Sequence, residues 1–313
     1  TGQVDSTLIT DSQVLSSVAE HYVNGFFAHD LDTNGKKLLL NADFFDYDNN
    51  SDQVFSTTTQ RMVLPGSNFD SFQNGVVQDI RSFSSSLDFE LPLESFDLKT
   101  GGKVSFIENN SIIESFDLSS GIPIRDEDQS SEFLYTENTQ ALYASGSKSW
   151  DKIEIQLGLR GEYTQTEGTS SATNAVVTND YLQIFPTAYF SYAPSDTHYF
   201  DITYGRRIDR PAYWRLNPFR RYNSVYSYTE GNPFLQPAFF DNLEASYTFR
   251  DALTFEVFYS RGTQGFNEIT LVSPESPLQV TTQQNFLTTH STGFTVSHFF
   301  SVGSFWESSN DAT

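Results

Sequence analysis

The sequence contains no cysteine, which excludes disulfide bonds, thiolate metal sites and a cysteine nucleophile. Basic residues are scarce: 18 Lys and Arg stand against 40 Asp and Glu, for a net charge of −22. A chain this acidic lacks the basic surface of a nucleic-acid-binding protein, so we expect no nucleic acid partner. No run of about 20 apolar residues is present, which excludes a transmembrane helix.

The signatures of a catalytic or metal-binding protein are also missing. No glycine-rich phosphate loop follows a strand pattern, and the five histidines are scattered without ligand spacing. Residues 46–52 (DYDNNSD) alternate oxygen-bearing side chains as a calcium loop does, but they lack its glycine and its final carboxylate, where Thr57 stands. We interpret this stretch as a solvated acidic turn, and we expect no enzyme activity, no catalytic residues, no cofactor and no bound metal.

The dominant pattern of the sequence is an alternation of apolar and polar residues with period two, which predicts β-strands. The clearest segment is 153–163, where Ile153, Ile155, Leu157 and Leu159 alternate with polar residues. Similar segments cover residues 87–94, 200–205, 243–250 and 253–259. Residues 11–23 could form a helix or a strand, and the alternation in the neighbouring segments favours the strand.

One apolar and one polar face per strand is compatible with two architectures. In a soluble β-sandwich, the apolar face covers a core. In a transmembrane β-barrel, the apolar face contacts lipid and the polar face lines a wet lumen. The barrel predicts that Glu154, Arg160 and Glu162 are buried while Ile155 and Leu157 are exposed, and the sandwich predicts the reverse.

The spacing of turns favours the barrel. Short turns are expected at residues 32–35, 93–97, 148–151, 193–198, 249–252 and 301–304. Between them lie long connections near residues 48–75, 109–130, 166–180, 208–237 and 265–278. Short and long connections alternate along the whole chain, as periplasmic turns and extracellular loops do in an outer-membrane barrel. Segments of about 10 to 15 residues between them are long enough to cross a bilayer.

Aromatic residues near the expected strand ends agree with this architecture, because such rings suit the membrane–water interface. We count about 11 or 12 strands. The chain begins at Thr1 without Met, a signal region or a basic leader, and it ends on WESSNDAT, without a terminal aromatic strand. We therefore expect residues 1–313 to be one segment of a single outer-membrane β-barrel domain.

The connection at residues 206–237 concentrates arginine, proline and aromatic residues. Arginines interleaved with rings can recognise an anionic group or stack on a sugar; equally, the arginines can pair with lumen carboxylates while the rings and prolines fix the loop. The second interpretation is favoured. The residues of this loop that we expect to contact a ligand are Arg207, Arg210, Tyr213, Trp214, Arg220, Arg221 and Tyr222.

The string RRIDRPAYWRLNPFRRY followed by YTEGNPFLQP resembles the outer-membrane β-barrel family of TonB-dependent receptors, in the form common in Bacteroidetes. The resemblance covers most of the chain and is strongest over residues 133–268. Alternating strands alone would not be specific, but the RPxYxxLNPF…EGNPxLxP pattern is.

The resemblance implies an all-β, antiparallel up-and-down barrel of about 22 strands in the Gram-negative outer membrane, of which this chain would be a part. It also implies a plug domain and an energy-coupling segment before Thr1, a periplasmic energy-coupling complex and, in some members, a surface lipoprotein partner. The implied function is uptake of a large or scarce nutrient. A non-transporting outer-membrane scaffold and a soluble glycan-binding β-sandwich are the alternatives.

Overall fold

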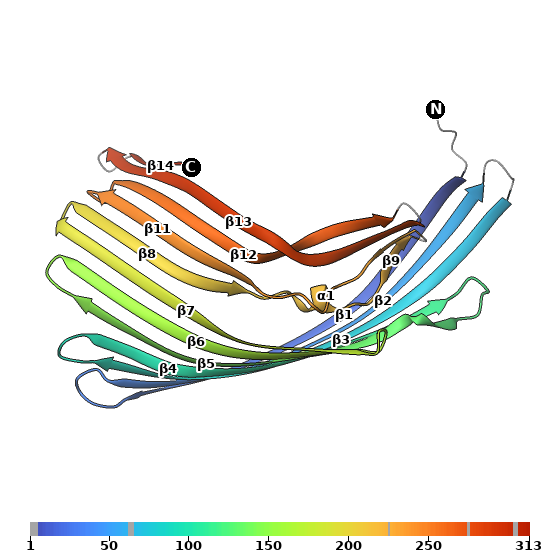
Figure 1. Ribbon diagram of the computed structural model, residues 1–313, viewed down its shortest axis with the longest axis horizontal. Helices are drawn as coiled ribbons and strands as arrows, with labels where there is room; N and C mark the ends of the chain where they lie inside the picture. Colours follow the sequence, from blue (N-terminus) through green and yellow to red (C-terminus); the bar gives the residue numbers. More distant parts are fainter. Residues whose placement is uncertain (1–5, 62–65, 225, 274–275, 303–305) are drawn as a thin grey trace.

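The computed structural model describes residues 6–61, 66–224, 226–273, 276–302 and 306–313. In these residues the chain forms one curved sheet, shaped like a trough, with a short helix inside it (Figure 1). The elements are β1 (Ser6–Asp30), β2 (Lys37–Arg61), β3 (Gly66–Pro92), β4 (Asp97–Asp117), β5 (Ile124–Ser149), β6 (Ile153–Ser170), β7 (Ala175–Ser195), β8 (His198–Asp209), α1 (Tyr213–Leu216), β9 (Arg221–Ser224), β10 (Ser227–Thr229), β11 (Ala238–Phe249), β12 (Leu253–Ser273), β13 (Ser276–Val302) and β14 (Trp306–Ala312).

The sheet has up-and-down topology. Each strand from β1 to β7 pairs antiparallel with the strand that follows it, β8 pairs with β11, and β11 to β14 continue in the same manner. The short strands β9 and β10 belong to the connection between β8 and β11, and β10 runs parallel to β13. Leaving these two aside, the wall has twelve strands. The expected all-β, antiparallel architecture of about 11 or 12 strands is confirmed.

The short turns fall where the sequence predicts them, and one shows why. In the turn between β1 and β2, the Asp32 carboxylate accepts hydrogen bonds from the backbone N–H groups of Asn34 (2.9 Å) and Lys36 (3.1 Å). An aspartate that accepts hydrogen bonds from backbone N–H groups a few residues later takes the place of the backbone acceptors that a turn lacks. The expected turn at residues 301–304 lies partly outside the described residues.

The expected long connections are mostly wrong, because the strands continue through them. Residues 48–75 and 265–278 belong almost entirely to strands, apart from positions outside the described residues. At residues 109–130 and 166–180, only 118–123 and 171–174 lie between strands. The strands are consequently longer than the 10 to 15 residues expected, reaching 27 in β3 and β13. The connection between β8 and β11, residues 210–237, is the one that is long.

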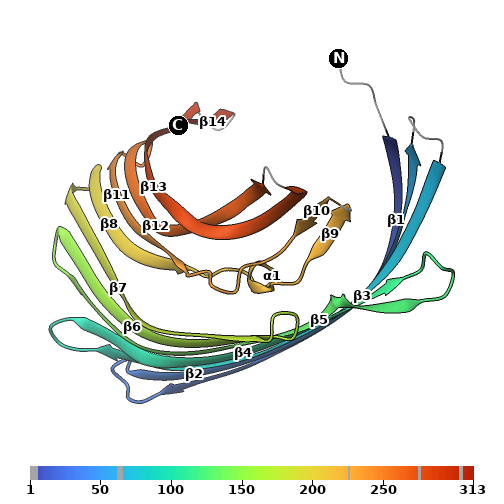
Figure 2. The ribbon, with the colours of Figure 1, turned by 45° about the vertical axis from the view of Figure 1, so that its right-hand side comes forward.

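The two faces of the sheet differ in polarity, and the arrangement is the reverse of that in a soluble protein: polar side chains are buried and apolar side chains are exposed. The helix α1 and its connection lie on the concave side (Figure 2), so the side chains that contact them point inward. The inward side chains include buried polar groups, among them Asn109, Thr139, Glu162, Thr164 and Gln283. On the opposite, convex face, Leu142, Leu157 and Leu182 are between 60% and 76% exposed.

This distribution largely fulfils the barrel expectation for β6. Glu162 is buried, Arg160 is half-buried and Leu157 is exposed, as expected for a strand between lipid and a wet lumen. Two positions near the short turn differ: Glu154 is exposed and Ile155 is only half-exposed. The trough is open at that end, so an inward carboxylate there remains in contact with solvent. The soluble sandwich alternative is wrong, because the described residues form one sheet and place no second sheet against its apolar face (Figure 1).

The apolar band on the convex face is as tall as the lipid-facing band of an outer-membrane barrel. On β6 it runs from Ile153 to Tyr163, and the next convex positions, Gln165 and Glu167, are polar and exposed. Ten residue steps span about 33 Å along a strand, or about 25 Å at the tilt of an outer-membrane barrel, which matches its apolar band.

On β1 to β4 the convex band ends at one row of paired apolar residues, Val23, Phe44, Phe83 and Phe106. The next convex row up carries the charged residues Asp46, Arg81 and Glu108. The Arg81 Nε lies 3.2 Å from the Asp46 Oδ1. This charged row marks the outer boundary of the band.

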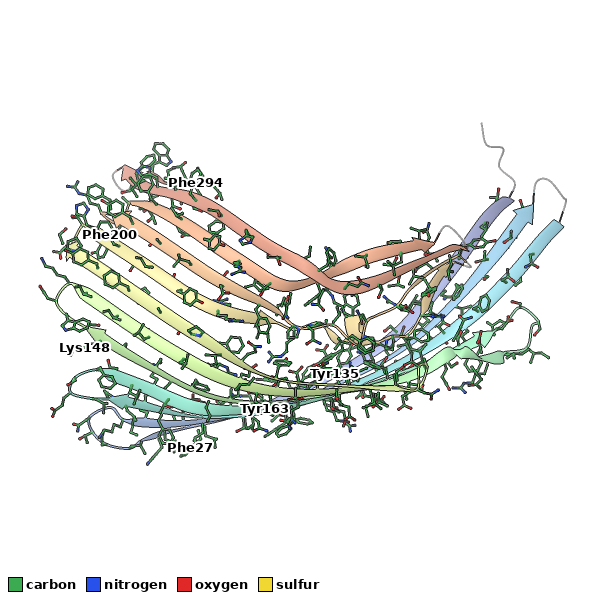
Figure 3. The ribbon with its side chains drawn as sticks, in the orientation of Figure 1. Phe27, Tyr135, Lys148, Tyr163, Phe200 and Phe294 are labelled. Carbon is green, nitrogen blue, oxygen red and sulfur yellow. The ribbon has the colours of Figure 1, made fainter. Side chains whose placement is uncertain are left out.

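Aromatic rings border the band at the end with the short turns. Tyr192, Phe200, Tyr247 and Phe255 are paired in register across β7, β8, β11 and β12. Their ring centroids are 6.2, 4.8 and 6.5 Å apart from one ring to the next. Figure 3 shows Phe200 and Lys148 at this end, far from Tyr135 beside α1. Within the described residues, no helix has the length and apolarity needed to cross a membrane.

Candidate functional site

The connection 210–237 is folded into the trough and forms the candidate site. It carries α1, β9 and β10 and lies against the inward face of the wall (Figures 1 and 2). Here we call it the inner loop. Most of the buried apolar residues of the described chain belong to it or contact it, including Leu216, Phe219, Tyr228 and Leu235.

Two Asn-Pro-Phe triplets give the inner loop its shape. In the first, the Asn217 side-chain oxygen accepts the backbone N–H of Phe219 at 3.0 Å. In the second, the Asn232 side-chain oxygen accepts the N–H of Phe234, also at 3.0 Å. Asparagine stabilises a turn in this manner, and the intervening proline fixes its backbone. The repeated NPF in the sequence is therefore a repeated turn.

The two turns are bonded to each other. The Gly231 N–H donates to the Asn217 carbonyl at 2.9 Å, and the Asn232 N–H donates to the Arg215 carbonyl at 2.6 Å. A Cβ on Gly231 would lie 2.7 Å from the Arg215 carbonyl oxygen and closer still to that of Asn217. Glycine is required at this position because the two backbone segments leave no room for a side chain.

Arg210 fastens the start of the inner loop to the wall. Its guanidinium donates to the Glu162 carboxylate and lies 3.3 Å from that of Glu137. It also donates to the Thr164 hydroxyl at 3.2 Å. The two carboxylate side chains are only 6% and 10% exposed. Carboxylates this deeply buried require cations beside them. Arg210 serves both, and Arg160 also pairs with Glu162 at 2.7 Å.

An apolar cluster holds the middle of the inner loop. Leu216 and Leu235 pack against Phe133 and Tyr135 of β5. The Tyr213 ring lies 5.3 Å from the Tyr135 ring. Burial, with the negative charge of Glu137, raises the pKa of Tyr213 to about 12, and burial raises that of Tyr135 further. Both phenols therefore remain neutral at ordinary pH. Burying a Leu side chain contributes about 1.5–3 kcal/mol, so this cluster fixes the loop firmly.

The end of the inner loop is bonded to the opposite side of the trough. Asn232 donates through Nδ2 to the carbonyl of Gln283 at 3.0 Å. Asn285 accepts the N–H of Gln236 and donates to its carbonyl, both at 2.8 Å. The loop therefore bridges β5 and β6 on one side and β13 on the other.

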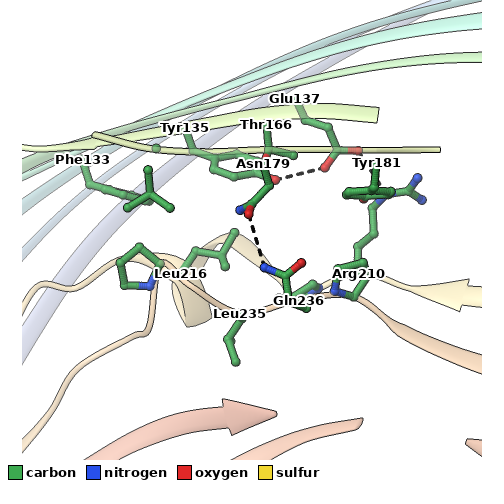
Figure 4. A pocket seen from close by; sticks show the side chains of 15 residues that line it. Phe133, Tyr135, Glu137, Thr166, Asn179, Tyr181, Arg210, Leu216, Leu235 and Gln236 are labelled. Carbon is green, nitrogen blue, oxygen red and sulfur yellow. Dashed lines mark hydrogen bonds and ion pairs between the residues drawn. The ribbon is translucent and has the colours of Figure 1, made fainter. Parts of the chain in front are cut away.

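Two cavities separate the inner loop from the wall. The first, between Phe133, Tyr181, Arg210 and Gln236, has about 30 Å³ and holds little more than water. Gln236 closes it by donating to Asn179 at 3.3 Å, while Tyr135 donates to Glu137 (Figure 4). The second, which we call the outer cavity, has about 260 Å³. The residues around it include Gln78, Asn109, Ser111, Trp214, Asn217 and Gln283.

The residues expected to contact a ligand fall into separate groups. Tyr213, Trp214 and Arg221 lie at the outer cavity. Arg220 is exposed and pairs with Glu230 at 3.1 Å. Arg210 is instead at the first cavity, engaged by carboxylates. Arg207 is exposed on β8, away from the outer cavity, and the Tyr222 side chain lies outside the described residues. Ligand contact by these residues stays a prediction.

Several polar residues were not identified as site residues from the sequence, although Glu162 was expected to be buried. Glu137 and Glu162 bind Arg210, while Asn109, Ser111 and Gln283 line the outer cavity. They stand at inward positions of alternating strands. The period-two pattern is the one sequence signal that could have identified them, since it predicts which polar residues face the lumen, but it does not separate these residues from the other lumen-facing polar residues. No group of three or more His, Asp or Glu in the described part of the chain could hold a metal ion.

Comparison with known families gives one match: the model described as "Outer membrane protein beta-barrel family" matches residues 29–313. No curated protein matches the sequence.

Solved structures with a similar fold are barrels of outer-membrane transporters and receptors. The copper transporter OprC aligns with a TM-score of 0.59 at 10% identity, over 98% of this chain and 59% of OprC. The ferric enterobactin receptor PfeA of Pseudomonas aeruginosa, in a mutant form bound to enterobactin, gives a TM-score of 0.53 at 13% identity, over 95% of this chain and 51% of PfeA. The chain thus spans between half and three-fifths of these structures, and at such identities the likeness shows the fold alone.

Proposed function

Because this chain belongs to the outer membrane protein β-barrel family, we propose that it forms the larger part of the barrel of an energy-coupled outer-membrane transporter. The whole protein would be a TonB-dependent receptor of the Bacteroidetes type with about 22 strands, and residues 1–313 would be one segment of that barrel. Its task would be the uptake of a large or scarce nutrient through the Gram-negative outer membrane.

The observation that carries the proposal is the inner loop inside a polar trough. A barrel that serves only as a membrane anchor has no need for a loop fixed at both ends across its lumen. Here Arg210 bonds the loop to β6, and Asn285 of β13 bonds it on the other side. A fixed loop narrows the passage, as a selective transporter requires.

The solved relatives support transport as a class but not a particular cargo. OprC is a copper transporter and PfeA binds ferric enterobactin. The partners would be outer-membrane lipid around the apolar band, a periplasmic energy-coupling complex and, in some settings, a surface lipoprotein that delivers the cargo.

The test uses the full-length gene in its own host. Deleting the gene should slow growth on the limiting nutrient, and restoring it should recover growth only when the energy-coupling complex is intact. A deletion strain with unchanged growth on every limiting nutrient tried, and a gene without plug and coupling segments, would contradict transport. That result would favour the second candidate, a non-transporting scaffold barrel.

A further inference from the structure

We propose that the outer cavity binds one neutral, hydroxyl-rich sugar unit of the transported ligand. The inference rests on the proposed function, because it names the chemical class of the cargo. The cavity lies on the external side of the apolar band: Asn109 directly follows Glu108, which belongs to the charged row above the band. The cavity therefore lies on the side from which an external ligand arrives.

The lining of the outer cavity offers paired donors and acceptors without a dominant charge. The side chains of Gln78, Asn109, Asn217 and Gln283 are amides, each with two donors and one acceptor. Gln283 is only 4% exposed, and its Oε1 has no hydrogen-bond partner among the described residues. A buried acceptor without a partner is costly, and a sugar hydroxyl would satisfy it.

A tryptophan supplies the apolar part of such a site. Trp214 lines the cavity and remains 53% exposed. The Arg215 guanidinium lies 4.9 Å from the Trp214 ring centroid and 5.1 Å from that of Phe266. One face of the indole is thus held by Arg215, which leaves the ring ordered and still accessible. An exposed, ordered ring beside fixed amides suits the C–H face of a sugar.

The distribution of charge argues against an anionic ligand. Arg210 is engaged by Glu137 and Glu162, and Arg220 pairs with Glu230. The cavity lining itself contains one cation, Arg221, and one carboxylate, Glu230, so it has no cluster of cations that would favour an anion. The volume of about 260 Å³ lies just below the range of about 300–1,000 Å³ that holds drug-sized ligands, and so accommodates one unit of a longer chain.

The experiment measures binding to the full-length receptor in detergent by isothermal titration. The probes are the neutral hexasaccharides maltohexaose, cellohexaose, xylohexaose and mannohexaose, with the acidic hexamer of galacturonate as a comparison. We expect at least one neutral probe to bind. Trp214→Ala and Gln283→Leu should each weaken that binding about tenfold or more, while Trp214→Phe should retain most of it.

Trp150→Ala is the matched control, because Trp150 is exposed to a similar extent, at 51%, but stands at the end with the short turns. This variant should bind the hexasaccharide as the wild type does. Gln283→Leu removes no bond of the inner loop, since Asn232 contacts the Gln283 backbone. Each variant must unfold at the wild-type temperature.

The proposal is overturned if no neutral hexasaccharide binds, if only the acidic one binds, or if both substitutions leave binding unchanged. Binding in detergent needs no energy coupling, so its loss is distinguishable from a failure of transport.

Discussion

The Arg210 guanidinium, at the start of the inner loop, donates a hydrogen bond to the carboxylate of Glu162, which belongs to strand β6 of the barrel wall. This contact joins the loop to a residue 48 positions earlier in the chain, and it adds a second cation to a carboxylate that Arg160 also binds, at 2.7 Å. With the Arg210–Glu137 contact, this ion pair ties the start of the loop to the wall.

Glu162→Gln should destabilise the barrel, because it leaves the Arg210 cation with Glu137 as its remaining carboxylate. Removing one partner of a buried ion pair costs about 3–5 kcal/mol; we expect the lower end, since the Arg210 side chain is 28% exposed. Urea unfolding in detergent measures the change. Glu127→Gln is the control: its pair with Arg125 is exposed, so it should cost less than about 1 kcal/mol. Equal effects of the two variants would contradict the anchoring role.

Gly231→Ala should disturb the contact between the two Asn-Pro-Phe turns. The new Cβ meets two backbone carbonyls, Asn217 and Arg215, which cannot move independently of the turns. Overpacking of this kind costs about 1–3 kcal/mol, and limited proteolysis should cut the inner loop faster. Gly161→Ala is the control, because a Cβ there meets nothing within 4 Å. Identical cleavage of both variants would show that the close approach is unimportant.

Leu157→Arg should impair insertion into the membrane. Leu157 stands on the convex face near the middle of the apolar band and is 60% exposed. An arginine facing lipid at mid-membrane costs about 2–4 kcal/mol, and near the interface about 0–1. Gln165→Arg, on the same face but above the band, should therefore be tolerated. Unfolding from lipid vesicles measures the loss of stability in both variants. A larger loss for Gln165→Arg than for Leu157→Arg would contradict the proposed position of the apolar band.

The turn at Asp32 should weaken in acid. Backbone donation from Lys36, chiefly, holds the pKa of Asp32 below its ordinary value. A lowered pKa means that the carboxylate stabilises the folded state above its unfolded pKa of about 3.9. That contribution is lost as the pH falls through the lower folded value. Asp32→Asn should be less stable than wild type at neutral pH and equal to it in strong acid. Unfolding measured from neutral pH to strong acid tests this. A difference in stability between Asp32→Asn and wild type that did not change with pH would contradict the role given to the Asp32 carboxylate.

The sequence predicts the membrane part of the fold well. Between Ile153 and Tyr163, one face contacts lipid and the other lines the lumen, so polarity must alternate and the pattern is visible. Above the band both faces meet water. Residues such as Gln53 and Asp79 can then be polar on either face, and the alternation disappears although the ladder of hydrogen bonds continues. The sequence consequently predicts loops where the strands in fact continue.

The candidate site is predicted only in part. The composition of residues 206–237 identifies the inner loop, and the interpretation that its arginines pair with lumen carboxylates agrees with the contacts of Arg210. The partners themselves, Glu137 and Glu162, lie about 70 and 50 residues earlier, and no local pattern links them to it. Only the register of β5 and β6 brings them beneath the loop.

The strands β2 and β3 continue 17 residues beyond Phe44 and Phe83, where the apolar band ends, a distance of about 55 Å along the chain. A ligand approaching the cell surface would therefore meet a rigid hydrogen-bonded wall where a flexible loop is usual. Ordering a loop at the moment of capture costs conformational entropy for every residue fixed. In this barrel that ordering would already be complete when the protein folds, and capture would proceed with little further loss.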